Sequence, residues 1–178
     1  MRERPATHRI ELLALRRNPQ SGLEDTADDQ HLFGASYLHA LGGSNLALDV
    51  GVRGGSFERA AQPDTEYVET HAGARWWFLG GDAPLQPYLG VGLMWNGRGS
   101  SSERYGSTAD FDDDDDNDLL SWLISHSSPY ASLGVDFKLG AVSVGGGLRA
   151  VCGDGVDLSA AHPDDFALDV YVTVGFGF

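Results

Sequence analysis

The densest group of potential metal ligands is an acidic run at residues 110–118, which has seven carboxylates in nine residues. Hard cations such as Ca²⁺ prefer several carboxylate oxygens, so Asp112, Asp114 and Asp116 are candidate ligands. The run fits no EF-hand register, because counting from Asp112 places Leu123 where the loop needs glutamate. Neighbouring carboxylates also repel one another and normally stay solvated. A solvated loop is therefore the competing interpretation, and we expect no cofactor.

A histidine and a serine, His126 and Ser128, are two residues apart, so both would face the same side of a strand. A base next to a hydroxyl is the arrangement that activates a serine nucleophile, and a carboxylate is needed to orient the histidine. The nearest downstream acid, Asp136, belongs to a different set of charges described below, and position 140 is Gly140. We expect no enzyme activity and interpret this segment as a loop-to-strand junction.

Other charged side chains alternate with apolar ones along eight segments. The last segment is the clearest, because every second residue from Phe166 to Phe178 is apolar without exception. Such alternation over several residues predicts strands with one apolar and one polar face. The predicted strands cover residues 8–15, 31–41, 45–53, 66–79, 85–96, 129–139, 141–152 and 166–178.

The polar faces of these strands carry five acidic and five basic residues together with one histidine. They are Arg9, Glu11, Asp49, Arg53, Glu69, His71, Arg75, Asp136, Lys138, Arg149 and Asp169. A solvent-facing surface has no reason to be neutral in a chain of net charge −14, whereas charges inside a narrow lumen must be paired. We therefore predict that the polar face points inward. Arg75 and Arg149 should join the five acids in one connected network, with His71 as a hydrogen-bond partner.

The predicted connections alternate between short and long. Short ones lie at residues 42–44, 80–84 and 140, and long acidic ones lie near residues 16–30, 54–65, 97–128 and 153–165. In an antiparallel meander, every second connection lies at the same end, and outer-membrane barrels have short turns at one end and long loops at the other. The pattern predicts an all-β fold, with residues 1–178 forming a single closed, antiparallel, up-and-down β-barrel of about eight strands, of the transmembrane type. Within the longest loop, residues 119–124 are apolar and form either a short helix or an extension of the sixth strand.

Composition excludes several classes of protein. The 24 glycines favour short strands with tight turns over long helices. With 26 acidic and 12 basic residues, the surface repels a nucleic-acid backbone. The single cysteine, Cys152, cannot form an intramolecular disulfide. Residues 1–8 lack the apolar core of a secretory signal, so we expect that an exported barrel would appear here in a mature or truncated form.

The C-terminal segment Tyr171-Val172-Thr173-Val174-Gly175-Phe176-Gly177-Phe178 resembles the terminal signal of bacterial outer-membrane proteins. Together with the segments at residues 87–93 and 129–135, it makes the chain similar to the OmpA-like transmembrane, or small porin-family, β-barrels. The resemblance implies a location in the bacterial outer membrane. It also implies contact with membrane lipid and lipopolysaccharide, and insertion by the outer-membrane assembly machinery through Tyr171, Phe176 and Phe178. We expect a monomer.

We expect a structural or surface-interaction role through the long acidic loops. Because an eight-stranded lumen is about wide enough to be filled by its own side chains, open diffusion of solutes is not expected. One alternative is a soluble or periplasmic lipocalin-like barrel that binds a small ligand, which has the same alternation with the opposite facing. A second is a lipid A-modifying hydrolase, because the spacing of His126 and Ser128 resembles that of the lipid A deacylase barrels.

Overall fold

Eight β-strands account for nearly all of the described chain. The computed structural model describes residues 7–19, 30–42, 44–59, 62–79, 83–99, 127–152 and 166–178. The strands are β1 (His8–Pro19), β2 (Gln30–Ala40), β3 (Leu46–Arg59), β4 (Gln62–Trp77), β5 (Leu85–Gly99), β6 (Ser128–Leu139), β7 (Val142–Cys152) and β8 (Phe166–Gly177). In this part of the chain, no helix has the length and apolar character needed to cross a membrane.

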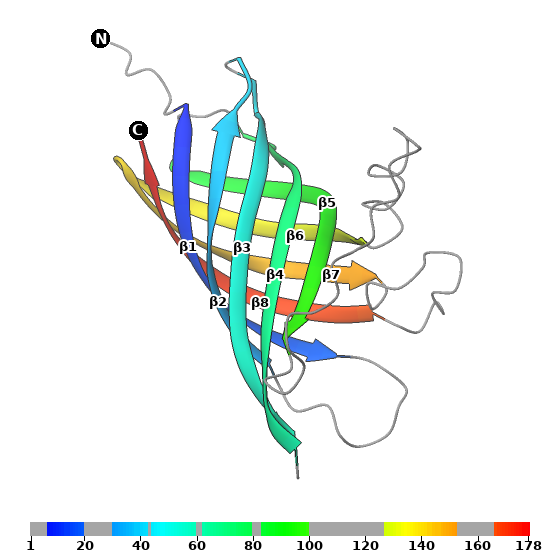
Figure 1. Ribbon diagram of the computed structural model, residues 1–178. Helices are drawn as coiled ribbons and strands as arrows, with labels where there is room; N and C mark the ends of the chain where they lie inside the picture. The colour runs from blue at the N-terminus through cyan, green and yellow to red at the C-terminus, as the bar shows by residue number, and fades with distance from the viewer. Residues whose placement is uncertain are drawn as a thin grey trace, which may run out of the picture.

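Each strand pairs antiparallel with the next, and β8 pairs back with β1, so the sheet closes into a barrel (Figure 1). The closing register places Arg9 opposite Gly177 and Pro19 opposite Ala167. Closure leaves no sheet edge exposed, which a membrane span requires because lipid cannot satisfy unpaired backbone groups. The predicted fold class, a closed antiparallel β-barrel of about eight strands, is confirmed with eight.

Three short turns lie at one end of the barrel, between β2 and β3, β4 and β5, and β6 and β7. Gly42 and Gly140 adopt positive φ angles of 57° and 69°, a conformation that glycine takes without steric cost. The first residues of β1 and the last residues of β8 lie at this same end, because their register pairs Arg9 with Gly177. We call it the turn end, and the opposite end, where the longer connections leave the strands, the loop end.

Strand boundaries differ from the prediction mainly at the loop end. The connection predicted near residues 54–65 is largely strand, because β3 and β4 stay paired out to Arg59 and Gln62. A long, acidic connection is predicted here, but the backbone N–H and C=O groups of any non-proline residue can extend a ladder that two neighbouring strands have begun. Similarly, β1 continues to Pro19 and β5 to Gly99. Both strands are therefore longer than the sequence pattern indicated.

The outer wall is apolar along the described strands. Large side chains that are roughly 40–60 % exposed cover it, among them Leu12, Leu48, Val50, Val91, Leu133, Val144, Val170 and Val172. Among the aromatic residues, Trp76, Phe176 and Phe178 are exposed on this wall near the turn end, and Trp95 is half-buried. A soluble barrel that displayed this surface would carry an apolar patch far larger than a few hundred Å². Apolar side chains thus point outward and polar side chains point inward, as in a transmembrane barrel and opposite to a lipocalin.

Candidate functional site

The interior of the barrel contains the polar side chains, most of them fully buried. The buried charged residues of the described chain are Arg9, Glu11, Arg17, Asp49, Arg53, Glu69, His71, Arg75, Asp136, Arg149 and Asp169. Five arginines therefore face five carboxylates, and this interior is neutral with His71 uncharged although the chain as a whole carries −14. Neutrality is what a narrow interior requires, because an unpaired buried charge costs several kcal/mol.

One set of ion pairs, which we call the turn-side group, lies toward the turn end and comprises Arg9, Glu11, Asp49, His71, Arg75 and Asp136. Arg75 is its centre: Nη1 donates to both carboxylate oxygens of Glu11 at 3.0 Å, and Nη2 donates to Asp49 at 2.8 Å. Arg9 bridges Glu11 at 2.9 Å and Asp136 at 2.6 Å. The imidazole Nε2 of His71 lies 3.2 Å from Asp49. One continuous network thus connects side chains from β1, β3, β4 and β6.

Aromatic side chains also contact this group, in which Asp136 Oδ1 and His71 Nδ1 are buried without a hydrogen-bond partner. The indole Nε1 of Trp77 donates to Asp136 at 3.2 Å, and the guanidinium of Arg75 lies 4.5 Å from the centre of the Tyr88 ring. The hydroxyls of Tyr88 and Tyr171 are 2.7 Å apart. A cation over an aromatic face and a hydrogen bond to each polar tip allow large residues to be buried in a charged interior.

A second set, the loop-side group, lies further from the turns and comprises Arg17, Arg53, Glu69 and Asp169. Arg17 is shared between the two acids, with its Nε 2.7 Å from Asp169 and its Nη1 2.7 Å from Glu69. Arg53 approaches the same acids at 3.3 and 3.5 Å. However, its Nε and Nη1 atoms are buried without a hydrogen-bond partner, and its Nη2 contacts the sulfur of Met94 at 3.5 Å. This group is neutral, but one of its arginines is poorly coordinated.

Arg149 lies between the two groups and differs from its predicted role. It forms no ion pair within 4 Å with any described carboxylate. Its guanidinium instead lies 4.5 Å from the ring centre of Tyr130 and 5.5 Å from that of Tyr171. The predicted single network with Arg75 and Arg149 is therefore wrong: the described ion pairs form two separate groups, and Arg149 is held by tyrosine rings.

Arg17 is buried in the lumen, although the predicted first strand ends at residue 15 and places this residue in a loop. The signal was present, because Arg17 has the same parity as Arg9, Glu11 and Leu13 along β1. Lys138 was counted in its place and is only half-buried, at the end of β6 beside the Gly140 turn. The predicted balance of five against five is thus reached, but with a different fifth cation.

Glycines on the inner face provide the space that the tyrosines occupy. A Cβ atom added to Gly134 would lie 2.5 Å from the Tyr88 ring, and one added to Gly73 would lie 2.5 Å from the Tyr130 hydroxyl. Such distances are far below contact distance, so no other residue fits without displacement. The glycine content therefore follows from the packing of the interior, which narrows any path along the barrel axis.

Of the two candidate catalytic residues, Ser128 is buried on the inner face at the start of β6, and His126 lies outside the described residues. The acidic candidates Asp112, Asp114 and Asp116, and residues 119–124, also lie outside them. Within the described part of the chain, no group of three or more histidine, cysteine or acidic side chains is arranged to hold a metal ion. Cys152 is exposed at the end of β7.

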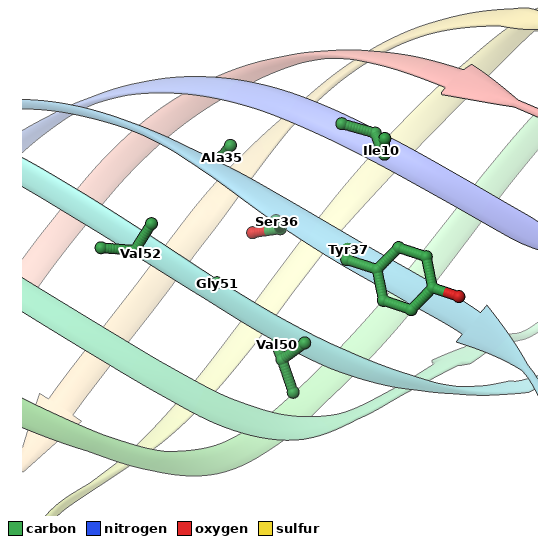
Figure 2. A pocket seen from close by; sticks show the side chains of 7 residues that line it. All are labelled: Ile10, Ala35, Ser36, Tyr37, Val50, Gly51 and Val52. Atoms are coloured by element: carbon green, nitrogen blue, oxygen red, sulfur yellow. The ribbon is translucent and has the colours of Figure 1, made fainter.

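A shallow depression of about 450 Å³, shown in Figure 2, lies on the outer wall over β1, β2 and β3. Its lining is Ile10, Ala35, Ser36, Tyr37, Val50, Gly51 and Val52, and the small residues Ala35 and Gly51 leave it unfilled. Small-molecule sites combine an apolar cleft with a few converging polar groups. This depression is nearly all apolar, so it fits lipid chains better than a polar ligand.

Comparison with solved structures identifies the fold. The chain is similar to Neisserial surface protein A (NspA), with 15% sequence identity, a TM-score of 0.66, and coverage of 97% of this chain and 98% of that one. The chain has the fold of the eight-stranded outer-membrane β-barrels. It is also similar to the N-terminal β-barrel domain of Pseudomonas aeruginosa OprF, with 12% identity, a TM-score of 0.50, and coverage of 94% and 97%.

No protein-family model matches the chain, and no curated protein matches its sequence. At such low identities, the likeness to an outer-membrane barrel concerns the fold and not the role. The predicted location in a bacterial outer membrane agrees with this fold and with the apolar outer wall.

Proposed function

We propose that this protein is an outer-membrane barrel with a filled interior that holds its outward-facing loops at the cell surface, and that it is neither a pore nor an enzyme. The observation that carries the proposal is the content of the lumen. Five arginines, five carboxylates and three tyrosines fill the interior of the described barrel. An eight-stranded barrel is just wide enough for side chains to fill it, so little room for solutes is left.

The loops supply the interaction surface in this proposal. The four connections at the loop end include the acidic run at residues 110–118, and they carry a large part of the net charge of −14. A strongly acidic surface favours basic or cation-bridged partners, of which the divalent cations between lipopolysaccharide phosphates are one class. Residues Asp112, Asp114 and Asp116 are the proposed ligands for such cations.

Insertion by the outer-membrane assembly machinery belongs to the same proposal. Phe176 and Phe178 are exposed on the outer wall of β8, where a recognition factor can reach them, whereas Tyr171 lies inside the barrel. Phe178→Ala should therefore lower insertion in cells far more than refolding in detergent. Equal losses in both would mean that the residue acts on fold stability alone.

The experiment that tests the central proposal is single-channel recording in planar bilayers. The refolded barrel should show no steady conductance in molar KCl, and a variant with Arg75 and Arg149 both replaced by alanine should conduct. Stable channels from the parent protein would overturn the filled-lumen proposal. Heat-modifiable migration of both proteins on gels establishes that each has refolded into a barrel before recording.

The lipid A hydrolase alternative is tested directly by replacing Ser128, which is not a member of any ion pair described above. The Ser128 side chain points into the barrel, away from the lipid in which a lipid A substrate would lie. Release of acyl chains from lipid A by the parent protein, abolished in Ser128→Ala, would replace our proposal with an enzymatic function.

A further inference from the structure

A pair of histidines lies on the outer wall at the turn end, apart from the lumen charges. His8 on β1 and His39 on β2 are direct cross-strand neighbours in the β1–β2 register. Their ring centres are 4.9 Å apart, and the two Nδ1 atoms approach to 3.3 Å. The hydroxyl of Tyr37, two residues before His39, lies 2.6 Å from Nδ1 of His8. Three polar atoms thus converge on one point of an otherwise apolar wall.

The distance between the two nitrogens fits a shared metal ion. Two metal–nitrogen bonds of about 2.0–2.1 Å, at the tetrahedral angle, separate their nitrogens by about 3.3–3.4 Å. The observed 3.3 Å lies in this range. A shared metal ion therefore needs no change in the separation of the two nitrogens, and the paired backbones of β1 and β2 fix the positions of both residues.

The surroundings of His8 restrict the orientation of its ring. The ring stacks on Tyr37 at 5.9 Å with an interplanar angle of 20°, and on Phe178 at 5.7 Å with an angle of 23°. Both histidines are half-buried, so the converging nitrogens are partly shielded and still reachable. A ligand that is already oriented loses little side-chain entropy when it binds.

Competition for a hydrogen bond at the His8 ring also favours a metal ion shared by the two histidines. The Nδ1 atom of His8 can form one hydrogen bond in the plane of the ring, but two partners are within reach, the Tyr37 hydroxyl and Nδ1 of His39. A neutral imidazole nitrogen carries either a proton or a lone pair, so only one of these contacts is made with ideal geometry. A cation that accepts both nitrogen lone pairs removes this competition. The Tyr37 hydroxyl can then hydrogen-bond a water molecule in the coordination shell.

We propose that His8 and His39 form a two-nitrogen binding site for a divalent transition metal ion of the Cu²⁺, Ni²⁺ and Zn²⁺ class. Imidazole ligands select these ions over Mg²⁺ and Ca²⁺, and affinity follows the order in which Cu²⁺ binds most tightly. Water completes the shell. With two protein ligands, the site is weaker than a four-ligand structural zinc site, so it suits reversible binding. This proposal is independent of the filled lumen and of the acidic loop.

The test uses the full chain refolded in zwitterionic detergent micelles at neutral pH. Titration calorimetry with ZnCl₂, NiCl₂ and CuCl₂ should show a saturable binding phase for one ion that depends on the two histidines, and MgCl₂ should show no histidine-dependent phase. His8→Ala and His39→Ala should each weaken this binding at least tenfold. His31→Ala is the matched control, because His31 is exposed on the same strand as His39 but lies at the other end of the barrel.

Two further measurements keep the outcome unambiguous. Replacing residues 110–118 with a short neutral segment removes acidic sites that would otherwise bind cations, and the histidine-dependent binding should persist. Electron paramagnetic resonance of bound Cu²⁺ should show coupling to two nitrogens, reduced to one in His39→Ala. Heat-modifiable migration confirms that each variant is folded. Binding that is equal in His8→Ala, His39→Ala and the parent protein, or the absence of saturable binding, would overturn the proposal.

Discussion

The two ion-pair groups inside the barrel both neutralise buried charges, but their central arginines differ in hydrogen-bond geometry. In the turn-side group, Arg75 donates three hydrogen bonds of 2.8–3.0 Å to Glu11 and Asp49. In the loop-side group, Arg53 approaches its acids at 3.3–3.5 Å and leaves two nitrogens without a hydrogen-bond partner. A buried charge is stabilised only when good geometry offsets its desolvation. We therefore expect Arg75 to contribute more to stability than Arg53.

The largest expected effect is that of Arg75→Ala. It leaves Glu11 and Asp49 buried beside a cavity, and removing one partner of a buried ion pair typically costs about 3–5 kcal/mol. Urea unfolding of the barrel in detergent micelles, followed by tryptophan fluorescence, measures the loss. Arg16→Ala is the control, because Arg16 is exposed on β1, and a solvated pair is worth at most about 1 kcal/mol. If Arg75→Ala unfolds like the parent protein, its carboxylate partners are not buried, and the polar-inward facing is wrong.

Arg17→Ala should cost less than Arg75→Ala, about 2–3 kcal/mol, although it too removes an arginine shared by two acids. The reason is Arg53, which lies 3.3 Å from Glu69 and stays in place to compensate. A double-mutant cycle sharpens the comparison. Arg17→Ala and Arg53→Ala should be strongly non-additive because they share both acids, whereas Arg17→Ala and Arg75→Ala share none of the described ion pairs and should add within about 0.5 kcal/mol.

Non-additivity between Arg17 and Arg75 would show that the two groups act as one network, as the sequence had suggested.

Which face of each strand points into the lumen follows from alternation alone. Side chains alternate between two faces, and the apolar face must contact lipid. Which charges meet across the lumen depends instead on strand tilt and stagger. That is why Arg149 was correctly assigned to the inner face but given the wrong partners. Arg17 was missed for a simpler reason: two arginines, an asparagine and a proline in a row look like a loop.

The layer of tyrosines between the groups gives a smaller effect. Tyr88→Phe removes the hydrogen bond to Tyr171 at 2.7 Å and leaves the ring under Arg75 in place. A single hydrogen bond contributes about 1 kcal/mol, and we expect a loss of this size.

Gly134→Ala tests the packing of the Tyr88 ring against the glycine on the neighbouring strand. Its new methyl group would lie 2.5 Å from the Tyr88 ring, and overpacking of this kind costs about 1–3 kcal/mol. Tyr88→Ala should relieve only part of this loss, because the same methyl group would also lie 2.7 Å from the backbone carbonyl oxygen of Gly146.

The smallest effect, and the sharpest test of the comparison, is expected for Arg53→Met. Arg53 is fully buried, but two of its nitrogens have no hydrogen-bond partner and its third contacts the sulfur of Met94. Methionine has a similar volume and packs well against another thioether, so the substitution removes the desolvation cost of the guanidinium together with its weak attraction to the two acids.

Glu69 and Asp169 both still pair with Arg17 at 2.7 Å, although one negative charge is then no longer balanced within this group. Because Arg17 still pairs both acids and the desolvation cost of Arg53 is removed, we expect a change of no more than about 1 kcal/mol in either direction. The matched substitution Arg75→Met should still cost about 3 kcal/mol or more, because no second arginine bonds both Glu11 and Asp49. Equal losses in the two variants would show that hydrogen-bond geometry does not distinguish the groups and that total charge balance alone stabilises the interior.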